Sequence, residues 1–222
     1  MICADSVKKS TSSCQDERGG VIPASALHFR LNQIEDATAL ITRFHYSRRM
    51  PANIQQVGTI HLPGGLFGDF GECIGAIIFS IPPTRWTEDI LELSRMVRHS
   101  DFKFPLSCFI ALSCNWLRKS GADLVISFAD PTYGHSGVVY KAAGWSYFGQ
   151  RKASMDGVLI NGTFVPGRSC NSKWGTRSPT KLAAMLRTEV HPSFDLGKHL
   201  FWKSLGKKGS AKAQRLGLLG IK

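Results

Sequence analysis

The order of helices and strands that the sequence predicts between residues 24 and 150 constrains this chain more than any other feature. In residues 33–44 the apolar side chains recur at helical spacing, and Asn32 precedes them as a candidate cap. Apolar runs predict strands at 57–62, 72–81, 90–98, 123–129 and 145–150, and helical patterns recur at 108–119 and 136–143. Helices and strands in this order are typical of an α/β fold, with a mixed central sheet flanked by helices.

Positive charge is concentrated in the last third of the chain. The sequence has 28 Lys and Arg against 16 Asp and Glu, a formal net charge of +12. Residues 1–150 hold 14 of the cations and 13 of the anions, whereas residues 151–222 hold 14 cations and 3 anions, a net charge of +11. This asymmetry indicates a polyanionic partner, with nucleic acid ahead of a membrane. The alternative is a basic tail that is simply well solvated.

The composition predicts three parts. Residues 1–23 are polar and are expected to form a flexible arm, residues 24–150 the main folded domain, and residues 151–222 a basic C-terminal extension that contacts the polyanion. Within the extension, residues 178–188 predict a helix with Ser178 as its cap and Pro179 in its first turn, and the rest is expected to be loop or short strand.

No membrane or secretory segment is expected. The apolar runs are too short to cross a bilayer, and the N-terminus lacks the apolar core of a secretory signal, so a cytoplasmic protein is expected. The six cysteines form no Cys-x-x-Cys pair. In a reducing compartment they are interpreted as small apolar residues rather than as metal ligands or a disulfide framework.

Three segments place reactive side chains beside turns. FHYSRR, with His45 and Tyr46, directly follows the first predicted helix. LELSRMVR reads as a strand. SFADP ends another strand with Asp130 at its carboxyl end, where open α/β sheets bind ligands. Each has a structural alternative: His45 interacting with a helix end, Asp130 as a helix cap, and Tyr140 as a core aromatic. Their joint position at the ends of elements favours a site.

The strand LELSRMVR carries an arginine among apolar residues. Strict alternation puts Leu91, Leu93, Arg95 and Val97 on one face, and residues 92, 94, 96 and 98 on the other. A buried arginine needs an anionic partner from the protein or from a ligand. The pattern therefore predicts that Arg95 is a buried cation with such a partner.

Together these motifs resemble the Mom family of bacteriophage adenine-modification proteins. HYSR, LELSRMVR, SFADPTYGHSGVVYKAAGWSYFGQ, NSKWGTRS and GKHLFWKSLGKK occur in this order from about residue 28 to residue 208. The resemblance implies a core similar to the acyl-CoA-dependent N-acetyltransferases. It also implies conversion of adenine in phage DNA to an N6-carbamoylmethyl (glycinamide-type) derivative, which protects against restriction enzymes in the host cytoplasm, with double-stranded DNA as the partner.

The resemblance implies a donor site with one departure. Residues 99–107, where the superfamily has a glycine-rich pyrophosphate loop, contain no glycine. A phosphate would then rely on the helix start at Ser107, helped by Lys103 or Arg98. The donor is left open between an acyl-CoA and a glycine-derived compound. Tyr140 matches the tyrosine that commonly serves as the acid in the superfamily.

The chemistry of adenine assigns the expected roles. N6 is a poor nucleophile because its lone pair is delocalised, so a base must remove a proton, and the nucleotide must be flipped or single-stranded. Asp130 is the candidate base, Tyr46 the residue expected to contact the adenine, and Arg95 with Ser94 the holders of the donor. The candidate catalytic residues are Asp130, Tyr46, His45, Arg95, Tyr140 and Ser127. The candidate DNA contacts are Arg48, Lys173, Trp174, Arg177 and Lys181, with Trp174 stacking on a base or wedging a step, or else lying in a core.

Three other hypotheses are open at this point. His45, Tyr46, Asp130 and His135 are alternative ligands for a metal such as iron, although no close pair at helical spacing supports this. A plain N-acetyltransferase acting on a protein or small amine is the rival enzyme. A DNA-binding protein without enzymatic activity explains the charge but not the polar clusters in residues 1–150.

Overall fold

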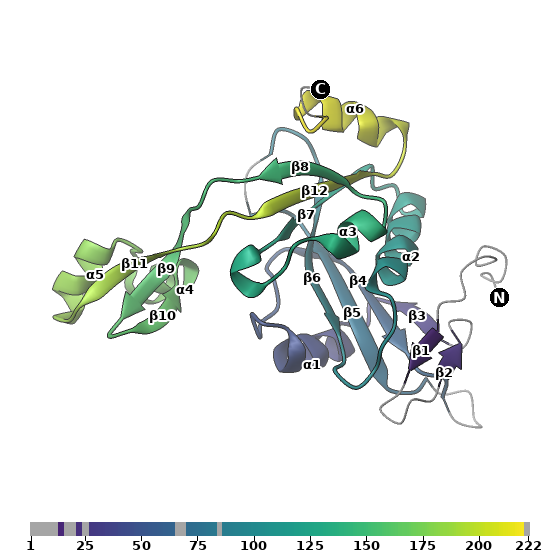
Figure 1. The fold of residues 1–222 in the computed structure, drawn as a ribbon, viewed down its shortest axis with the longest axis horizontal. Helices are drawn as coiled ribbons and strands as arrows, with labels where there is room; N and C mark the ends of the chain where they lie inside the picture. Colours follow the sequence, from purple (N-terminus) through teal and green to yellow (C-terminus); the bar gives the residue numbers. More distant parts are fainter. Residues whose placement is uncertain (1–12, 16–20, 24–26, 65–69, 84–85, 220–222) are drawn as a thin grey trace. The chain divides into compact units, whose positions relative to one another are not determined.

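The computed structural model describes residues 13–15, 21–23, 27–64, 70–83 and 86–219 (Figure 1). The chain forms two compact units. The first comprises the described residues of Met1–Ser127, Val138–Phe148 and Phe201–Lys222, and the second comprises Phe128–Gly137 and Gly149–Leu200. No helix among the described residues is both long enough and apolar enough to span a membrane.

A seven-stranded sheet organises the fold. Its strands are, in spatial order, β3 (His28–Leu31), β4 (Ile54–His61), β5 (Cys73–Ser80), β6 (Leu91–Arg98), β7 (Leu124–Ala129), β12 (His199–Ser204) and β8 (Ser146–Gln150). Pairing is antiparallel from β3 to β6 and parallel between β6 and β7. The predicted mixed sheet is therefore confirmed.

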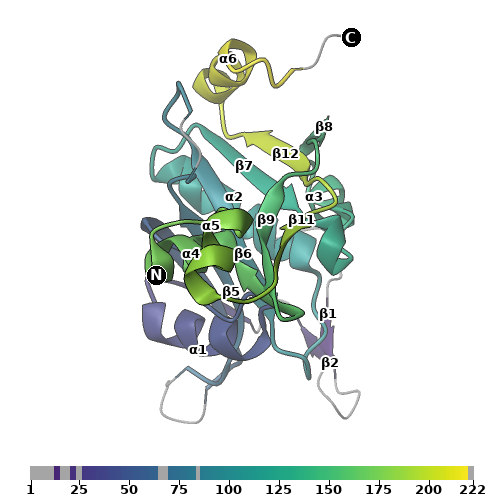
Figure 2. The ribbon, with the colours of Figure 1, turned by 90° about the vertical axis from the view of Figure 1, so that its left-hand side faces the viewer.

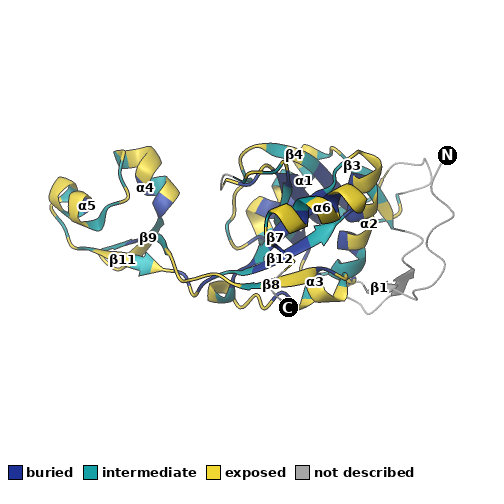
Figure 3. Ribbon diagram, turned by 90° about the horizontal axis from the view of Figure 1, so that it is seen from above, coloured by how far each residue is buried: buried dark blue, intermediate teal, exposed yellow. Residues whose placement is uncertain are grey.

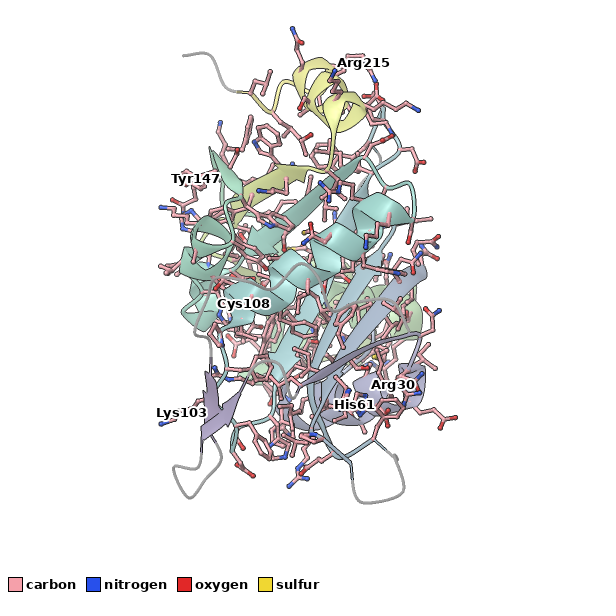
Figure 4. All side chains as sticks on the ribbon, turned by 90° about the vertical axis from the view of Figure 1, so that its right-hand side faces the viewer. Arg30, His61, Lys103, Cys108, Tyr147 and Arg215 are labelled. Atoms are coloured by element: carbon pink, nitrogen blue, oxygen red, sulfur yellow. The ribbon has the colours of Figure 1, made fainter. Side chains whose placement is uncertain are left out.

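Helices cover both faces of this sheet in the first unit. On one face, α1 (Ile34–Phe44) packs Ala37, Leu40 and Ile41 into a cluster with Ala76 and Ile78 of β5. Successive strand residues point to opposite faces, so Gly75 points the other way. A Cβ on Gly75 would lie 2.7 Å from the Phe104 ring, just before α2 (Leu106–Lys119). Helix α2 therefore lies across the opposite face, as Figure 4 shows.

The helix boundaries differ from the expected ones by at most two residues. Asn32 has a φ of +61°, and Gln33 takes the cap position of α1 without a side-chain hydrogen bond. Helix α2 begins at Leu106, and the short helix α3 spans Val138–Ala142.

The expected flexible arm is paired where it is described. Strand β1 (Ser13–Gln15) forms an antiparallel pair with β2 (Val21–Pro23). The other residues of the expected arm lie outside the described residues. The arm therefore contains backbone structure that its polar composition did not predict.

The last third of the chain is not one extension. Three strands, β9 (Met155–Ile160), β10 (Thr163–Pro166) and β11 (Val190–Phe194), form an antiparallel sheet in the order β10-β9-β11. Helices α4 (Gly167–Trp174) and α5 (Pro179–Leu186) pack on it through a core of Val158, Cys170 and Leu182 (Figure 2). Where one helix and otherwise loop or short strand were expected, this segment therefore forms a small α/β fold. Ser178 caps α5 and Pro179 opens it, as predicted.

Strand β12 and helix α6 (Lys207–Arg215) also lie in the segment whose basic composition suggested an extension. Leu200, Phe201 and Trp202 are three consecutive apolar residues, and all three are buried. Such a run is the signal of a strand covered on both faces, and it could have been found in the basic segment. Its pairing between β7 and β8 completes the sheet.

Candidate active site

A β-bulge at Ser94 decides which side chains of β6 share a face. Ile78 pairs with Arg95 and Phe79 with Leu93, so Ser94 is the extra residue. Cross-strand partners point to the same face, and Ile78 and Phe79 point to opposite faces. Arg95 therefore lies on the α1 face and Leu93 on the α2 face, which corrects the alternation expected from the sequence.

The same register puts Glu92 on the face of Arg95. Glu92 pairs with Ser80, which is two residues from Ile78 on β5. The parallel pairing of β6 with β7 covers Leu91–Leu93 and Val125–Ser127. The half-buried Glu92 therefore lies in the part of β6 that is paired with β7.

Ser127, Tyr140 and Leu93 form a short hydrogen-bond chain. The Ser127 hydroxyl lies 2.8 Å from the Leu93 carbonyl oxygen and 2.8 Å from the Tyr140 hydroxyl. A carbonyl oxygen only accepts, so the single hydroxyl proton of Ser127 goes to Leu93. Tyr140 must then donate to Ser127 Oγ.

Tyr140 holds its proton firmly. The pKa of the Tyr140 hydroxyl is raised to about 12, mainly by burial and also by the nearby charges of Tyr46 and Glu92, while the hydrogen bond between Tyr140 and Ser127 acts to lower it. The ring also contacts Trp145 and Phe201, with centroids 5.3 Å and 5.2 Å away. Because the charges of Tyr46 and Glu92 act on the Tyr140 hydroxyl, both side chains lie near it. Residues from three of the predicted segments therefore meet here.

Arg95 is half-buried rather than buried. Its Nε donates to the Arg49 carbonyl at 3.3 Å and its Nη1 to the Ser94 carbonyl at 2.6 Å. The Ser94 hydroxyl donates to the Ile78 carbonyl at 3.2 Å across the bulge. Arg95 thus ties the loop after α1 to β6, which brings the first two motifs together.

The loop after α1 sets the tautomer of His45. The ring is buried, and its Nδ1 accepts the Ser47 backbone N–H at 3.1 Å, with the Ser47 hydroxyl at 2.9 Å. A neutral His45 therefore carries its proton on Nε2. The neighbouring Tyr46 is 48% exposed, with its ring centroid 4.3 Å from that of His45. Arg48 is exposed, with a φ of +46°.

Asp130 belongs to the second unit, where its carboxylate caps a turn and forms an ion pair. One carboxylate oxygen accepts the Thr132 backbone N–H at 3.0 Å and caps the 3-10 turn Pro131–Tyr133. The other lies 3.2 Å from Lys198 Nζ. The cap was the alternative that the sequence offered for this residue. A role for Asp130 or the nearby His135 in the chemistry stays a prediction.

Of the expected donor residues, Arg98, Lys103 and Ser107 lie near the start of α2, whereas Arg95 lies on the opposite, α1 face of the sheet. The Arg98 guanidinium donates to the Phe104 carbonyl at 2.8 Å and braces the loop, whereas Lys103 is exposed and points outward (Figure 4). Ser107 is half-buried in the first turn, which has no acidic residue. An anion fits this helix end electrostatically. The segment before this helix contains no glycine, so its backbone cannot approach a pyrophosphate as closely as a glycine-rich loop does.

The metal hypothesis gains no support from the described residues. Within them, no group of three or more His, Cys, Asp and Glu side chains lies close enough to hold an ion. His45 Nδ1 already accepts the Ser47 backbone N–H.

The candidate DNA contacts lie mainly on the second unit. Lys173, Arg177 and Lys181 are exposed on or between α4 and α5. Trp174 is half-buried against the small core, with Lys173 Nζ 4.8 Å from its ring centroid. Its ring serves the core that the sequence offered as the alternative, and base stacking by Trp174 is not proposed.

Glu92 is the site residue that sequence reasoning missed. It stands in the motif LELSR, but the expected alternation assigned it to the face away from Arg95. A bulge leaves no clear pattern in a single sequence, whereas a carboxylate inside an otherwise apolar strand was a visible signal.

Several solved acetyltransferases are similar to this chain in structure at low sequence identity. A spermidine N-acetyltransferase from Vibrio cholerae is 9% identical, with a TM-score of 0.48 over 83% of this chain and 96% of that chain. A Bacillus subtilis acetyltransferase in complex with CoA is 10% identical, with a TM-score of 0.46 over 80% and 98%. A ribosomal-protein-S5-alanine acetyltransferase from Vibrio fischeri is 12% identical, with a TM-score of 0.46 over 82% and 94%. No activity follows from similarity at this level.

The family is settled by the sequence itself. The Mom protein family model matches residues 26–202, most of the chain, and the chain therefore belongs to the Mom protein family, as its motifs predicted. No curated protein matches the sequence.

Proposed function

We propose that this chain is a phage DNA-modifying transferase that converts adenine to its N6-carbamoylmethyl derivative and so protects DNA from restriction. The observation that carries the proposal is membership of the Mom family over residues 26–202. The meeting of the HYSR, LELSR and SFAD motifs around Tyr140 supports a reaction centre in the first unit.

Glu92 is our candidate for the base. Its charge acts on the Tyr140 hydroxyl, and it shares a face of β6 with Arg95, whereas Asp130 is occupied by a cap and an ion pair. As the bond from N6 to the donor carbon forms, Glu92 takes the N6 proton. Tyr46, whose side chain is 48% exposed, would contact the adenine ring.

Tyr140 is our candidate for the acid. Because its pKa is about 12, it is protonated at neutral pH and can pass its proton to the leaving group as the bond from the donor carbon breaks. The Ser127 hydroxyl can then turn from the Leu93 carbonyl and donate to the phenolate oxygen. This proton path needs only groups that already touch.

The donor is the open part of the proposal, an acyl-CoA-type or a glycine-derived compound. When bound, it supplies the carbon that N6 attacks and the group that leaves. A phosphate of this donor would lie at the first turn of α2 near Ser107, where no acidic side chain opposes it.

The test is mass spectrometry of nucleosides from DNA of cells that express the chain. We expect an adenine adduct with the added mass of a carbamoylmethyl group. Unaltered adenine alongside soluble, folded protein would refute the proposal. Acetyl transfer to a protein or small amine without DNA would instead support the rival acetyltransferase.

Two substitutions decide which carboxylate is the base. Glu92→Gln removes the charge and keeps the size, so we expect adduct formation to fall by about 10²-fold or more. Asp130→Asn keeps an oxygen for the cap, and we expect adduct to persist with a lower melting temperature. The reverse result would make Asp130 the base.

A further inference from the structure

Helices α4 and α5 of the second unit form a pair joined by a tight turn. Helix α4 ends at Gly175, whose φ is +69°, and α5 begins at Pro179. Cys170 of α4 and Leu182 of α5 meet the same β9 residue, Val158, so both helices lie on one face of the small sheet (Figure 2). The pair thus presents its outer side as a single surface.

The outer side of α5 is exposed and includes two residues with short side chains, Thr180 and Ala184. Thr180, Lys181, Ala184 and Met185 are exposed, and Met185 is 57% exposed. Thr180 and Ala184 are four residues apart and lie on the side away from the buried Leu182, whereas Met185, three residues after Leu182, lies at the border of the buried side. Figure 3 shows exposed residues along both helices, with buried ones toward β9. Small side chains let a helix approach a partner closely.

This surface is also positive without a compensating acid. Residues 167–188 contain no Asp or Glu. They contain five exposed cations: Arg168, Lys173, Arg177, Lys181 and Arg187. None takes part in an ion pair within the described residues. The field here is therefore uncancelled.

In helix α6, the other basic helix, two of the cations form ion pairs within the protein. Lys212 lies 3.0 Å from Asp123, and Arg215 makes two hydrogen bonds to Glu88, at 2.6 and 3.1 Å. Part of the positive charge of the last third is therefore neutralised by ion pairs on α6, and part is exposed on α4 and α5. On α6 this leaves Lys207 and Lys208 exposed outside any ion pair among the described residues, whereas the α4–α5 surface carries five such cations.

We propose that the outer face of α5 docks into the major groove of duplex DNA, with Arg177, Lys181 and Arg187 on flanking phosphates. The groove is wide enough for a helix, and cations at both ends of α5 suit phosphates on either side of it. Ala184 and Met185 would face the base edges. The inference rests on the proposed function, because it takes the DNA substrate as the partner.

The test is binding of the full chain to a duplex oligonucleotide at several salt concentrations. Ala184→Glu puts a carboxylate on the docking face while keeping a good helix former. We expect binding at least 10-fold weaker. Ala39→Glu, on an exposed position of α1, is the matched control and should bind as the unchanged chain does.

A second pair of variants counts phosphate contacts. The double variant Arg177→Ala, Lys181→Ala should lower the slope of log affinity against log salt by about two. The double variant Lys207→Ala, Lys208→Ala removes the same charge from α6 and should leave the slope unchanged. Circular dichroism checks that each variant is folded.

The outcomes separate this inference from the proposed function. Equal binding by Ala184→Glu and Ala39→Glu, or an unchanged slope for the Arg177 and Lys181 variant, overturns the docking surface even if adenine is modified. Loss of binding in those variants supports the surface even if the unchanged chain modifies no adenine, a result that would refute only the proposed function.

Discussion

At the residue scale, one hydroxyl proton determines the direction of a buried chain. Ser127 must donate to the Leu93 carbonyl, so it can only accept from Tyr140. The same two residues could have been ordinary core groups, and the packing of Tyr140 on Phe201 shows that they also serve the core. The two roles separate in their response to substitution.

Removing either member of this chain should have unequal effects on stability. Ser127→Ala leaves the Tyr140 hydroxyl buried without its acceptor, at a cost of about 1–3 kcal/mol. Tyr140→Phe leaves Ser127 bonded to Leu93, so we expect it to cost less in denaturant unfolding. Its adduct yield should nevertheless fall by about 10²-fold or more. Full activity in Tyr140→Phe would make the residue a core aromatic only.

The thiols of the half-buried Cys73 and the buried Cys114 should react slowly in the folded chain. Burial raises the pKa of Cys73 to about 12 and that of Cys114 to about 11. Because the thiolate is the nucleophile, alkylation by iodoacetamide at about pH 8 should be much slower than in the unfolded chain. Peptide mass spectrometry measures both rates. Equal labelling before and after denaturation would contradict this expectation.

At the element scale, α6 is held by charge as well as by packing. Ala213 and Leu218 are buried, and Figure 4 shows Arg215 on this helix, where it pairs with Glu88 ahead of β6. Its basic composition alone suggested a solvated tail. The hydrogen bond from Arg215 lowers the pKa of Glu88, which makes the attachment sensitive to pH.

The attachment of α6 should weaken in acid. The pKa of Glu88 is lower in the folded chain than in the unfolded one, so its stabilisation is present above the unfolded pKa and is lost as pH falls through the folded pKa. Arg215→Gln should therefore destabilise the chain at neutral pH and low salt but not at about pH 2. Lys208→Gln is the control. Equal differences at both pH values in denaturant unfolding would refute the ion-pair account.

At the scale of the whole molecule, the chain builds two cores. The small unit buries Val158, Cys170 and Leu182, separate from the cluster around α1 and β5. Asp195, just after β11, accepts hydrogen bonds from the backbone N–H groups of Ser154, just before β9, and of Gly197. These bonds tie the two ends of the small sheet together. Two cores allow two unfolding events.

The small unit should be destabilised by itself. Leu182→Ala removes a fully buried side chain, and we expect a loss of about 2–5 kcal/mol in the stability of the α4–α5 fold. Hydrogen exchange should accelerate in residues 155–194 and stay unchanged in β4 and β5. Exchange that rises equally throughout the chain would show a single cooperative unit.

The sequence by itself determined the order and type of most elements in the first unit, because hydrophobic periodicity is a local property. The helix at residues 34–44, the strands from β4 to β8 and the Ser178 cap of α5 were all predictable in this way. The family was predictable from its motifs. The meeting of HYSR with LELSR was only a hypothesis, since distance between segments is not local.

Only the tertiary structure decided which side chains share a face and which charges are available. The bulge at Ser94 moved Arg95 to the face of Glu92, because one extra residue reverses the alternation of a strand. Strand β12 found its place between β7 and β8 through pairing with residues far away in the chain. Ion pairing on α6 cancelled charges that composition had counted as free, because formal charge does not record its neighbours.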